Sequence, residues 1–220
     1  MKPSNPVRYI KDFIHSKAVV FWDFDGVIKE SLNAKACAFE KLFEPYGVDI
    51  ATRVRKHHES NGGISRFIKI PLYLEWAGLP PSKVEVERFS ARYSELVLQS
   101  VIDSPWVDGV REYLESFHEH QYFILLTATP NVEIKSIIHR IGISSYFREV
   151  FGAPIDKSEA IAGIVRRHGG KRQPMLVIGD SENDMIAARD NGITFLLRCT
   201  PYNRPLQAVH RGLGFETLIS

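Results

Sequence analysis

The stretch that decides the fold is residues 18–27, AVVFWDFDGV, in which an apolar run leads into two aspartates. Side chains alternate along an extended chain, so Asp23 and Asp25 fall on the same side and repel each other unless a cation lies between them. Mg²⁺ prefers oxygen ligands and would neutralise such a pair. A solvated turn after a strand is the alternative, and the rest of the chain has to decide between the two.

Later stretches repeat the design of an apolar run that ends in polar groups. Residues 125–130 read LLTATP, residues 156–160 read DKSEA, and residues 177–185 read VIGDSENDM. In open α/β sheets, ligands bind at the carboxyl ends of the strands. The repetition therefore favours a ligand site over a series of unrelated turns.

Four of these features follow one another in an order that resembles the haloacid dehalogenase superfamily, over about residues 18–200. They are Asp23-x-Asp25-Gly26-Val27, Thr127 after a strand, Lys157 at the start of a helix, and Gly179-Asp180-x-x-x-Asp184. Each motif alone is weak, but four in order leave little room for coincidence. The resemblance implies a phosphohydrolase with a helical cap, similar to phosphoglycolate phosphatases and β-phosphoglucomutases.

The hydrophobic pattern predicts an α/β fold with a doubly wound, mainly parallel sheet, as the resemblance also implies. Short apolar runs predict strands at residues 18–24, 122–128, 175–178 and 194–197, with a further short one at 149–151. Apolar stripes at helical spacing predict helices within 110–117, 134–141 and 160–165. Alternating strands and helices indicate right-handed crossovers around a buried parallel sheet.

One segment, residues 33–102, shows helical patterns and no core strand. Ser82 is placed to cap a helix there, and residues 103–105, DSP, close the segment. An insert directly after the first strand resembles the small helical cap of the superfamily. We therefore predict a catalytic core made of residues 1–32 and 103–220, with a helical cap at 33–102.

The resemblance assigns the central chemistry to the first two aspartates. Asp23 is expected to be the nucleophile that forms an aspartyl-phosphate. Asp25 is expected to protonate the leaving oxygen and then to activate water, which requires that its pKa lie above that of Asp23. In the superfamily, an aspartate at this second position accompanies phosphatases and phosphomutases and is missing from dehalogenases.

Further residues are expected to hold the phosphoryl group and a cation. Thr127 and the amide of Ala128 can donate to phosphoryl oxygens, Lys157 supplies a positive charge, and Gly26 allows a tight turn beside the phosphate. The metal site is expected to hold Mg²⁺, and its ligands are Asp23, the backbone carbonyl of Asp25, Asp180 and Asp184. Capping a helix is the alternative role for acidic residues there.

Residues 61–69, NGGISRFIK, combine a glycine pair with two basic residues at helical spacing. We expect the loop at Gly62 and Gly63 to lie near the substrate, with Arg66 or Lys69 binding an anionic part of it. A solvated basic helix start is the plainer interpretation. The neighbouring His57 and His58 have no evident third ligand for a metal and are interpreted as surface residues or cap contacts.

Composition sets the remaining limits. The 220-residue chain has a formal net charge of +2, which gives no electrostatic reason to expect nucleic acid or a membrane as partner. Cys37 and Cys199 stand alone, and neither a transmembrane run nor a signal peptide is evident, so we expect a cytoplasmic protein. The expected partner is a small phosphorylated metabolite, and the sequence does not indicate an oligomeric state.

These observations predict a Mg²⁺-dependent phosphatase that hydrolyses a small phosphate monoester, such as a sugar phosphate or a phosphoglycolate-like acid. A phosphomutase of the β-phosphoglucomutase type is the first alternative, because sequence motifs barely separate the two activities. The second alternative is a binding or regulatory module that keeps the fold without turnover, although every motif residue is present.

Overall fold

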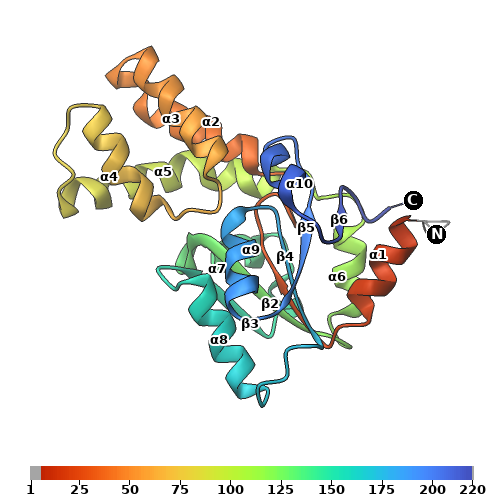
Figure 1. Cartoon of the computed structure of the whole chain (residues 1–220). Coiled ribbons are helices and arrows are strands. Elements are labelled where there is room, and N and C mark those ends of the chain that lie inside the picture. The colour runs from red at the N-terminus through yellow and green to blue at the C-terminus, as the bar shows by residue number, and fades with distance from the viewer. Residues whose placement is uncertain (1–5, 220) are drawn as a thin grey trace.

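The computed structural model describes residues 6–219, which form a six-stranded parallel sheet with helices on both faces and a helical segment above one edge (Figure 1). The strands, in chain order, are β1 (Val19–Trp22), β2 (Tyr122–Pro130), β3 (Glu149–Ala153), β4 (Met175–Gly179), β5 (Thr194–Arg198) and β6 (Gly214–Phe215). The sheet order β3-β2-β1-β4-β5-β6 confirms the doubly wound α/β prediction. Only β6 was not expected.

The helices are α1 (Pro6–His15), α2 (Leu32–Phe43), α3 (Val48–Ser60), α4 (Arg66–Trp76), α5 (Lys83–Asp103), α6 (Val110–Phe117), α7 (Asn131–Arg140), α8 (Lys157–Arg167), α9 (Glu182–Asp190) and α10 (Arg204–Val209). Short 3₁₀ turns occur at Glu44–Tyr46 and Ser144–Tyr146. No helix within residues 6–219 is both long enough and apolar enough to cross a membrane.

Alternating side chains of the buried strands build two hydrophobic layers. From β1, Val19 and Phe21 pack toward α8 and α9, whereas Val20 and Trp22 pack toward α1, α6 and α7. Trp22 is fully buried against Tyr113 and so faces away from the site, as its position next to Asp23 predicts. Both faces of the sheet are therefore covered, which accounts for its continuous apolar strands.

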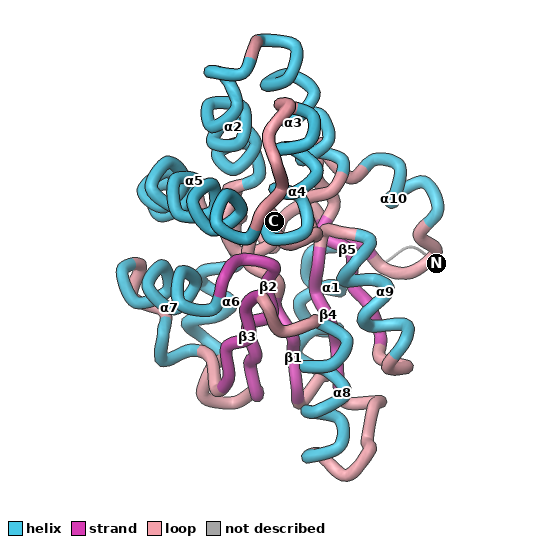
Figure 2. Tube along the Cα trace, turned by 90° about the vertical axis from the view of Figure 1, so that its left-hand side faces the viewer, coloured by secondary structure: helices cyan, strands magenta, loops and turns pink. Residues whose placement is uncertain are grey.

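Residues 33–102, called the helical insert below, contain α2 to α5 and no strand. Figure 2 shows these helices gathered above the sheet, while α7, α8 and α9 flank it. Ser82 caps α5 by accepting a hydrogen bond from the amide of Glu85 at 3.3 Å, as predicted. The aromatic rings of Phe39, Tyr73 and Tyr93 pack against one another inside the insert.

The register of the parallel strands determines where the polar residues meet. Trp22 at the end of β1 lies beside Leu125 of β2 and Ile178 of β4. Residues that follow these three positions therefore emerge at one edge of the sheet, directly below the helical insert. This edge holds the candidate site.

Candidate active site

The first element of the site is the turn after β1. The amide of Asp23 donates to the carbonyl of Ile178 at 2.9 Å, which keeps the end of β1 tied to β4. The chain then turns at Gly26, whose φ of +75° suits glycine. An added Cβ at Gly26 would lie 2.6 Å from a carboxylate oxygen of Asp180, so a larger residue has no room.

Three buried carboxylates, those of Asp23, Asp180 and Asp184, converge at this edge. Each offers an oxygen within 4.8 Å of the others, a spacing at which they can share one cation. Burial, reinforced by the neighbouring carboxylates, raises the pKa of Asp23 to about 7 and that of Asp180 well above its ordinary value. An all-oxygen set of three carboxylates, whose charge exceeds that of the one lysine in contact with them, fits a hard divalent cation such as Mg²⁺.

Lys157 opens α8 and reaches into the same cluster. Its Nζ lies 2.8 Å from Asp23 Oδ1 and 2.6 Å from Asp184 Oδ1. Both carboxylates raise the pKa of this buried lysine, which outweighs the opposing effect of burial. Asp156 caps α8 by accepting hydrogen bonds from the amides of Ser158 and Glu159. The cap fixes the start of the helix at Lys157, whose side chain is buried.

Asp184 also serves α9, the helix on which it lies. Its Oδ2 accepts hydrogen bonds from the hydroxyl of Ser181 at 2.5 Å and from the amide of Ser181 at 3.2 Å. The hydroxyl oxygen of Ser181 in turn accepts a hydrogen bond from the amide of Asp184, and the two residues together form a capping box. Asp184 therefore caps α9, the alternative role considered for it, and also contacts Lys157.

Asp25 faces away from the carboxylate cluster and toward α2. Its carboxylate accepts hydrogen bonds from the Lys35 ammonium, from Ser31 at 2.6 Å and from Thr129 at 3.2 Å. Burial raises the pKa of Asp25, but Lys35 and these hydrogen bonds outweigh it and hold the pKa below its ordinary value. With protein groups alone, the pKa of Asp23 is raised and that of Asp25 is lowered, which is the reverse of the order expected from the sequence; a cation at Asp23 would lower the pKa of Asp23.

Lys35, Ser31 and Thr129 are the site residues that the sequence analysis missed. Ser31 is the N-cap residue of α2, which starts just after the Asp23–Asp25 turn, and Lys35 follows four residues later on that helix. That spacing was the only signal available for them. Thr129 lies in the part of β2 between Leu126 and Pro130, where the register with β3 shifts.

Thr127 and Ala128 lie at the end of the central part of β2, as expected. Thr127 is buried, and its Oγ1 accepts a hydrogen bond from the amide of Thr129 at 3.2 Å. That bond does not use the hydroxyl proton of Thr127, which can be donated to a ligand. Both residues line a cavity of about 30 Å³ that also contains Asp23, Asp25 and Lys157.

The helical insert closes this cavity from above with Arg66 and Lys69, both of which are buried. The interpretation of a solvated helix start is therefore wrong for them, because they are only 5% and 2% exposed. The guanidinium of Arg66 contacts Glu133 of α7 at 2.5 and 2.9 Å. The Lys69 ammonium instead contacts His58, which is buried inside the insert and is not a surface residue.

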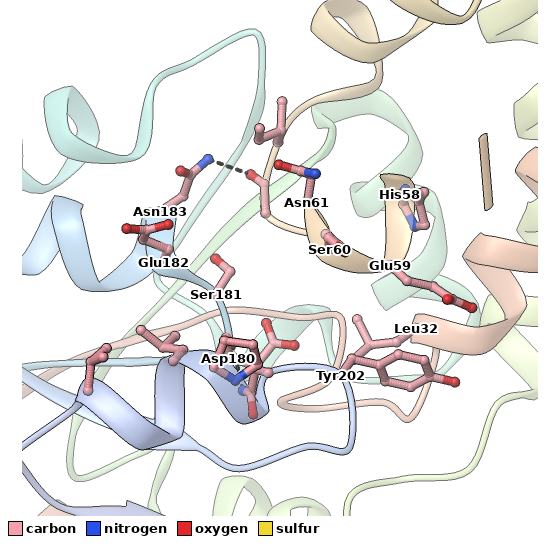
Figure 3. A pocket seen from close by; sticks show the side chains of 17 residues that line it. Leu32, His58, Glu59, Ser60, Asn61, Asp180, Ser181, Glu182, Asn183 and Tyr202 are labelled. Atoms are coloured by element: carbon pink, nitrogen blue, oxygen red, sulfur yellow. Dashed lines mark hydrogen bonds between the residues drawn. The ribbon is translucent and has the colours of Figure 1, made fainter. Parts of the chain in front are cut away.

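A loop of the insert, residues 61–65, continues the closure and contacts the core. The side chain of Asn183 donates a hydrogen bond to the carbonyl of Gly63 at 3.0 Å, drawn as a dashed line in Figure 3. Beside this contact a groove of about 380 Å³ runs between insert and core, lined among others by Leu32, His58 and Tyr202. Because Leu32 and His58 also line the cavity, the groove adjoins it.

Comparison with known proteins places the chain in a family. Residues 20–197 match the model of the haloacid dehalogenase-like hydrolases. The chain belongs to this family. The two motif aspartates, Thr127, Lys157 and Asp180 all fall inside the matched region, and the structure brings them together at one sheet edge.

Relatives of this haloacid dehalogenase-like hydrolase include several phosphatases. A phosphoglycolate phosphatase of Photobacterium profundum is 27% identical over 194 residues, which is 82% of either chain. A phosphoglycolate phosphatase of Vibrio parahaemolyticus is 34% identical over 89 residues, a match that spans only 39% of that protein. A 5′-nucleotidase of Pseudomonas aeruginosa is 21% identical and covers 79% of both chains.

Solved structures share the fold at low sequence identity. A β-phosphoglucomutase of Clostridium difficile superposes with a TM-score of 0.72 and 20% identity over 92% of each chain. A haloacid dehalogenase-like hydrolase of Streptococcus pneumoniae gives a TM-score of 0.68 with 17% identity, covering 92% of this chain and 95% of the other. These likenesses confirm the α/β architecture predicted from the sequence.

Proposed function

We propose that this hydrolase is a Mg²⁺-dependent phosphatase that acts on a small phosphate monoester through an aspartyl-phosphate. One observation carries the proposal: a single buried cavity brings together Asp23, Asp25, Thr127 and Lys157, residues that lie far apart in the sequence. The cavity adjoins the cluster of three carboxylates. A nucleophile, an acid, hydrogen-bond donors and a cation site are the parts that phosphoryl transfer requires.

In the first step, a carboxylate oxygen of Asp23 attacks phosphorus and the bond to the leaving oxygen breaks. Asp25 donates a proton to that oxygen, so the leaving group departs as an alcohol. In the second step Asp25 takes a proton from water, which attacks phosphorus, releases inorganic phosphate and restores the Asp23 carboxylate. The Ser31, Lys35 and Thr129 contacts position Asp25 for both transfers.

Donors around the cavity are proposed to stabilise the phosphoryl oxygens. Thr127 supplies its hydroxyl proton, Ala128 its amide and Lys157 a positive charge, while Gly26 keeps the turn tight beside the phosphate. Asp23, Asp180 and Asp184, together with the backbone carbonyl of Asp25, would hold Mg²⁺. When bound, Mg²⁺ would neutralise charge on the carboxylates and on the transferring group.

The helical insert at residues 33–102 is proposed to act as a cap over residues 1–32 and 103–220. It excludes water from the cavity, which strengthens electrostatic interactions at the reacting group. Arg66 and Lys69 line the cavity from the side of the insert, which supports a role for them at the non-reacting end of a substrate. Lys69 is proposed to contact the substrate directly. Arg66 is proposed to support substrate binding indirectly, through its contact with Glu133.

The proposal is tested by measuring phosphate release from a panel of phosphorylated metabolites. Activity is expected with Mg²⁺, none in excess EDTA, and inhibition by Ca²⁺, because Ca²⁺ takes more ligands at longer distances. Full activity in excess EDTA would overturn the metal assignment. No phosphate release from any member of the panel would overturn the phosphatase assignment.

A phosphomutase is the second candidate, favoured by the small cavity of about 30 Å³ over which residues of the helical insert fold. A cavity that excludes water would let an aspartyl-phosphate survive long enough to transfer its phosphoryl group to another hydroxyl. Isomerised sugar phosphate formed without free phosphate would favour this alternative over hydrolysis.

A further inference from the structure

The three carboxylates of the cluster differ in what holds them in place. Lys157 contacts both Asp23 and Asp184, and Ser181 donates two further hydrogen bonds to Asp184. Within residues 6–219, no group donates a hydrogen bond to the carboxylate of Asp180 or forms an ion pair with it. The position of the Asp180 carboxylate therefore depends chiefly on its backbone, which lies between β4 and α9.

The side chain of Asn203 holds that backbone. Its Nδ2 donates to the carbonyl of Asp180 at 2.7 Å and to the carbonyl of Arg198, at the end of β5, at 2.8 Å. Its Oδ1 accepts hydrogen bonds from the amide of Thr200 at 2.9 Å and from Nε2 of Gln207 at 2.6 Å. Two donated and two accepted bonds use the full capacity of a side-chain amide. Within residues 6–219, no other donor reaches the Asp180 carbonyl.

Capping of α10 does not account for this arrangement. Asn203 stands at the N-cap position of α10, where asparagine is a preferred residue, yet its side chain makes no capping hydrogen bond. A flipped amide would set its oxygen against the carbonyls of Asp180 and Arg198, so the neighbours require the observed orientation. Asp180 and Asn203 line the groove beside the cavity, together with Tyr202 (Figure 3). The amide thus connects the turn after β4 to the segment after β5.

We propose that Asn203 is a positioning residue that fixes Asp180 for binding of the cation. This inference rests on the proposed function, in which Asp180 is a ligand of Mg²⁺. Mg²⁺ demands a near-ideal arrangement of its ligands, and groups that orient the ligands from outside typically contribute about tenfold to a hundredfold to metal affinity. Without the amide of Asn203, the turn at Asp180 gains conformational freedom that has to be lost again when the ion binds. The expected effect is a weaker affinity for Mg²⁺.

The test measures the binding of Mg²⁺ alone by isothermal titration calorimetry, without substrate. Asn203→Ser removes the amide but leaves a residue type that is preferred at a helix N-cap. Its dissociation constant for Mg²⁺ should be roughly tenfold higher than that of the wild type. In phosphate release, the Mg²⁺ concentration for half-maximal rate should rise by a similar factor, while kcat at saturating Mg²⁺ should change by less than about threefold.

Gln207→Met is the matched control. It removes two hydrogen bonds from the same loop, to Asn203 and to the carbonyl of Thr200, but leaves the bond between Asn203 and Asp180. It should bind Mg²⁺ within about twofold of the wild type. Thermal unfolding checks that each variant is folded. If Asn203→Ser does not unfold cooperatively, Asn203→Gln decides, because it keeps the amide but displaces it by a methylene group and should raise the dissociation constant several-fold.

Two outcomes would overturn the inference alone. One is an equal affinity for Mg²⁺ in the Asn203 variant and the wild type. The other is an equal loss of affinity in Gln207→Met, which would mean that the loop acts on the site only through its general stability. Both leave the proposed function standing, because the wild type still binds Mg²⁺. A wild type that releases phosphate but binds no Mg²⁺ would instead overturn the metal assignment, and the inference with it.

Discussion

Replacement of Gly63 by alanine is expected to hold the helical insert off the core. A Cβ at Gly63 would lie 2.3 Å from the Ser181 hydroxyl oxygen and 2.7 Å from Ser181 Cβ, and neither glycine of the Gly62–Gly63 pair has a positive φ. Unstrained carbon contacts are about 3.5–4.0 Å, so the loop has to retreat by roughly 1 Å. The retreat also weakens the Asn183 hydrogen bond to the Gly63 carbonyl.

The cost of closure can be estimated from these two contacts. Overpacking costs about 1–3 kcal/mol and a lost hydrogen bond about 0.5–1.5 kcal/mol. Together they correspond to a fall in kcat/KM of roughly tenfold to a thousandfold. Gly62→Ala is the matched control, because a Cβ there meets nothing within 4 Å, and both substitutions restrict the unfolded chain equally.

The assay is steady-state phosphate release by the two alanine variants and the wild type, with thermal unfolding measured in parallel. Gly62→Ala should stay within about twofold of the wild type, and both variants should unfold cooperatively. Equal kcat/KM values for Gly62→Ala and Gly63→Ala would refute the idea that turnover needs the loop in its observed position.

Three other substitutions test the site. Asp23→Asn should abolish turnover, by about a thousandfold or more, while the fold is retained; near wild-type activity in a sample shown by mass spectrometry to contain no deamidated protein would remove Asp23 from its role. Lys35→Met should lower kcat by roughly tenfold to a hundredfold, a part of what acid–base catalysis supplies, since Asp25 loses its charged partner; unchanged kcat would show that Lys35 does not position Asp25. Arg66→Met should destabilise the protein by about 3 kcal/mol, because the Glu133 carboxylate is left buried without its cation and keeps only the hydrogen bond from Ser94. Arg66→Met combined with Glu133→Leu should recover most of that loss in thermal unfolding; simple addition of the two single effects would contradict the pairing.

The sequence predicted the parts of the fold that carry strong periodicity. The strands at 122–128 and 175–178 are almost entirely apolar, because both faces of the sheet are covered, and such runs are readily recognised. The strand β6 spans only Gly214–Phe215, too short for any alternation to appear. The helix α1 was also not assigned, although Ile10 and Ile14 are buried one turn apart.

Site residues were predictable where the backbone alone positions them. Asp23 and Asp180 each follow a parallel strand and Thr127 lies near the carboxyl end of another, and the ends of neighbouring parallel strands meet at one edge. Lys35 and His58 lie on helices of the insert, and their positions depend on how those helices fold back over the sheet. No local pattern encodes that packing, which explains why the partner of Asp25 was missed and why the sequence could not decide whether His58 is a surface residue or, as the structure has it, a contact within the insert.

The charges between insert and core bear on how the insert opens. Two ion pairs span the boundary, Lys35 with Asp25 and Arg66 with Glu133, and both are largely buried when the insert is closed. Opening would return these charges to water, and the gain in hydration roughly balances the lost attraction. Closure is therefore expected to be weakly favoured. A ligand that contacts both the insert and the core would shift the population toward the closed state, because it binds that state better.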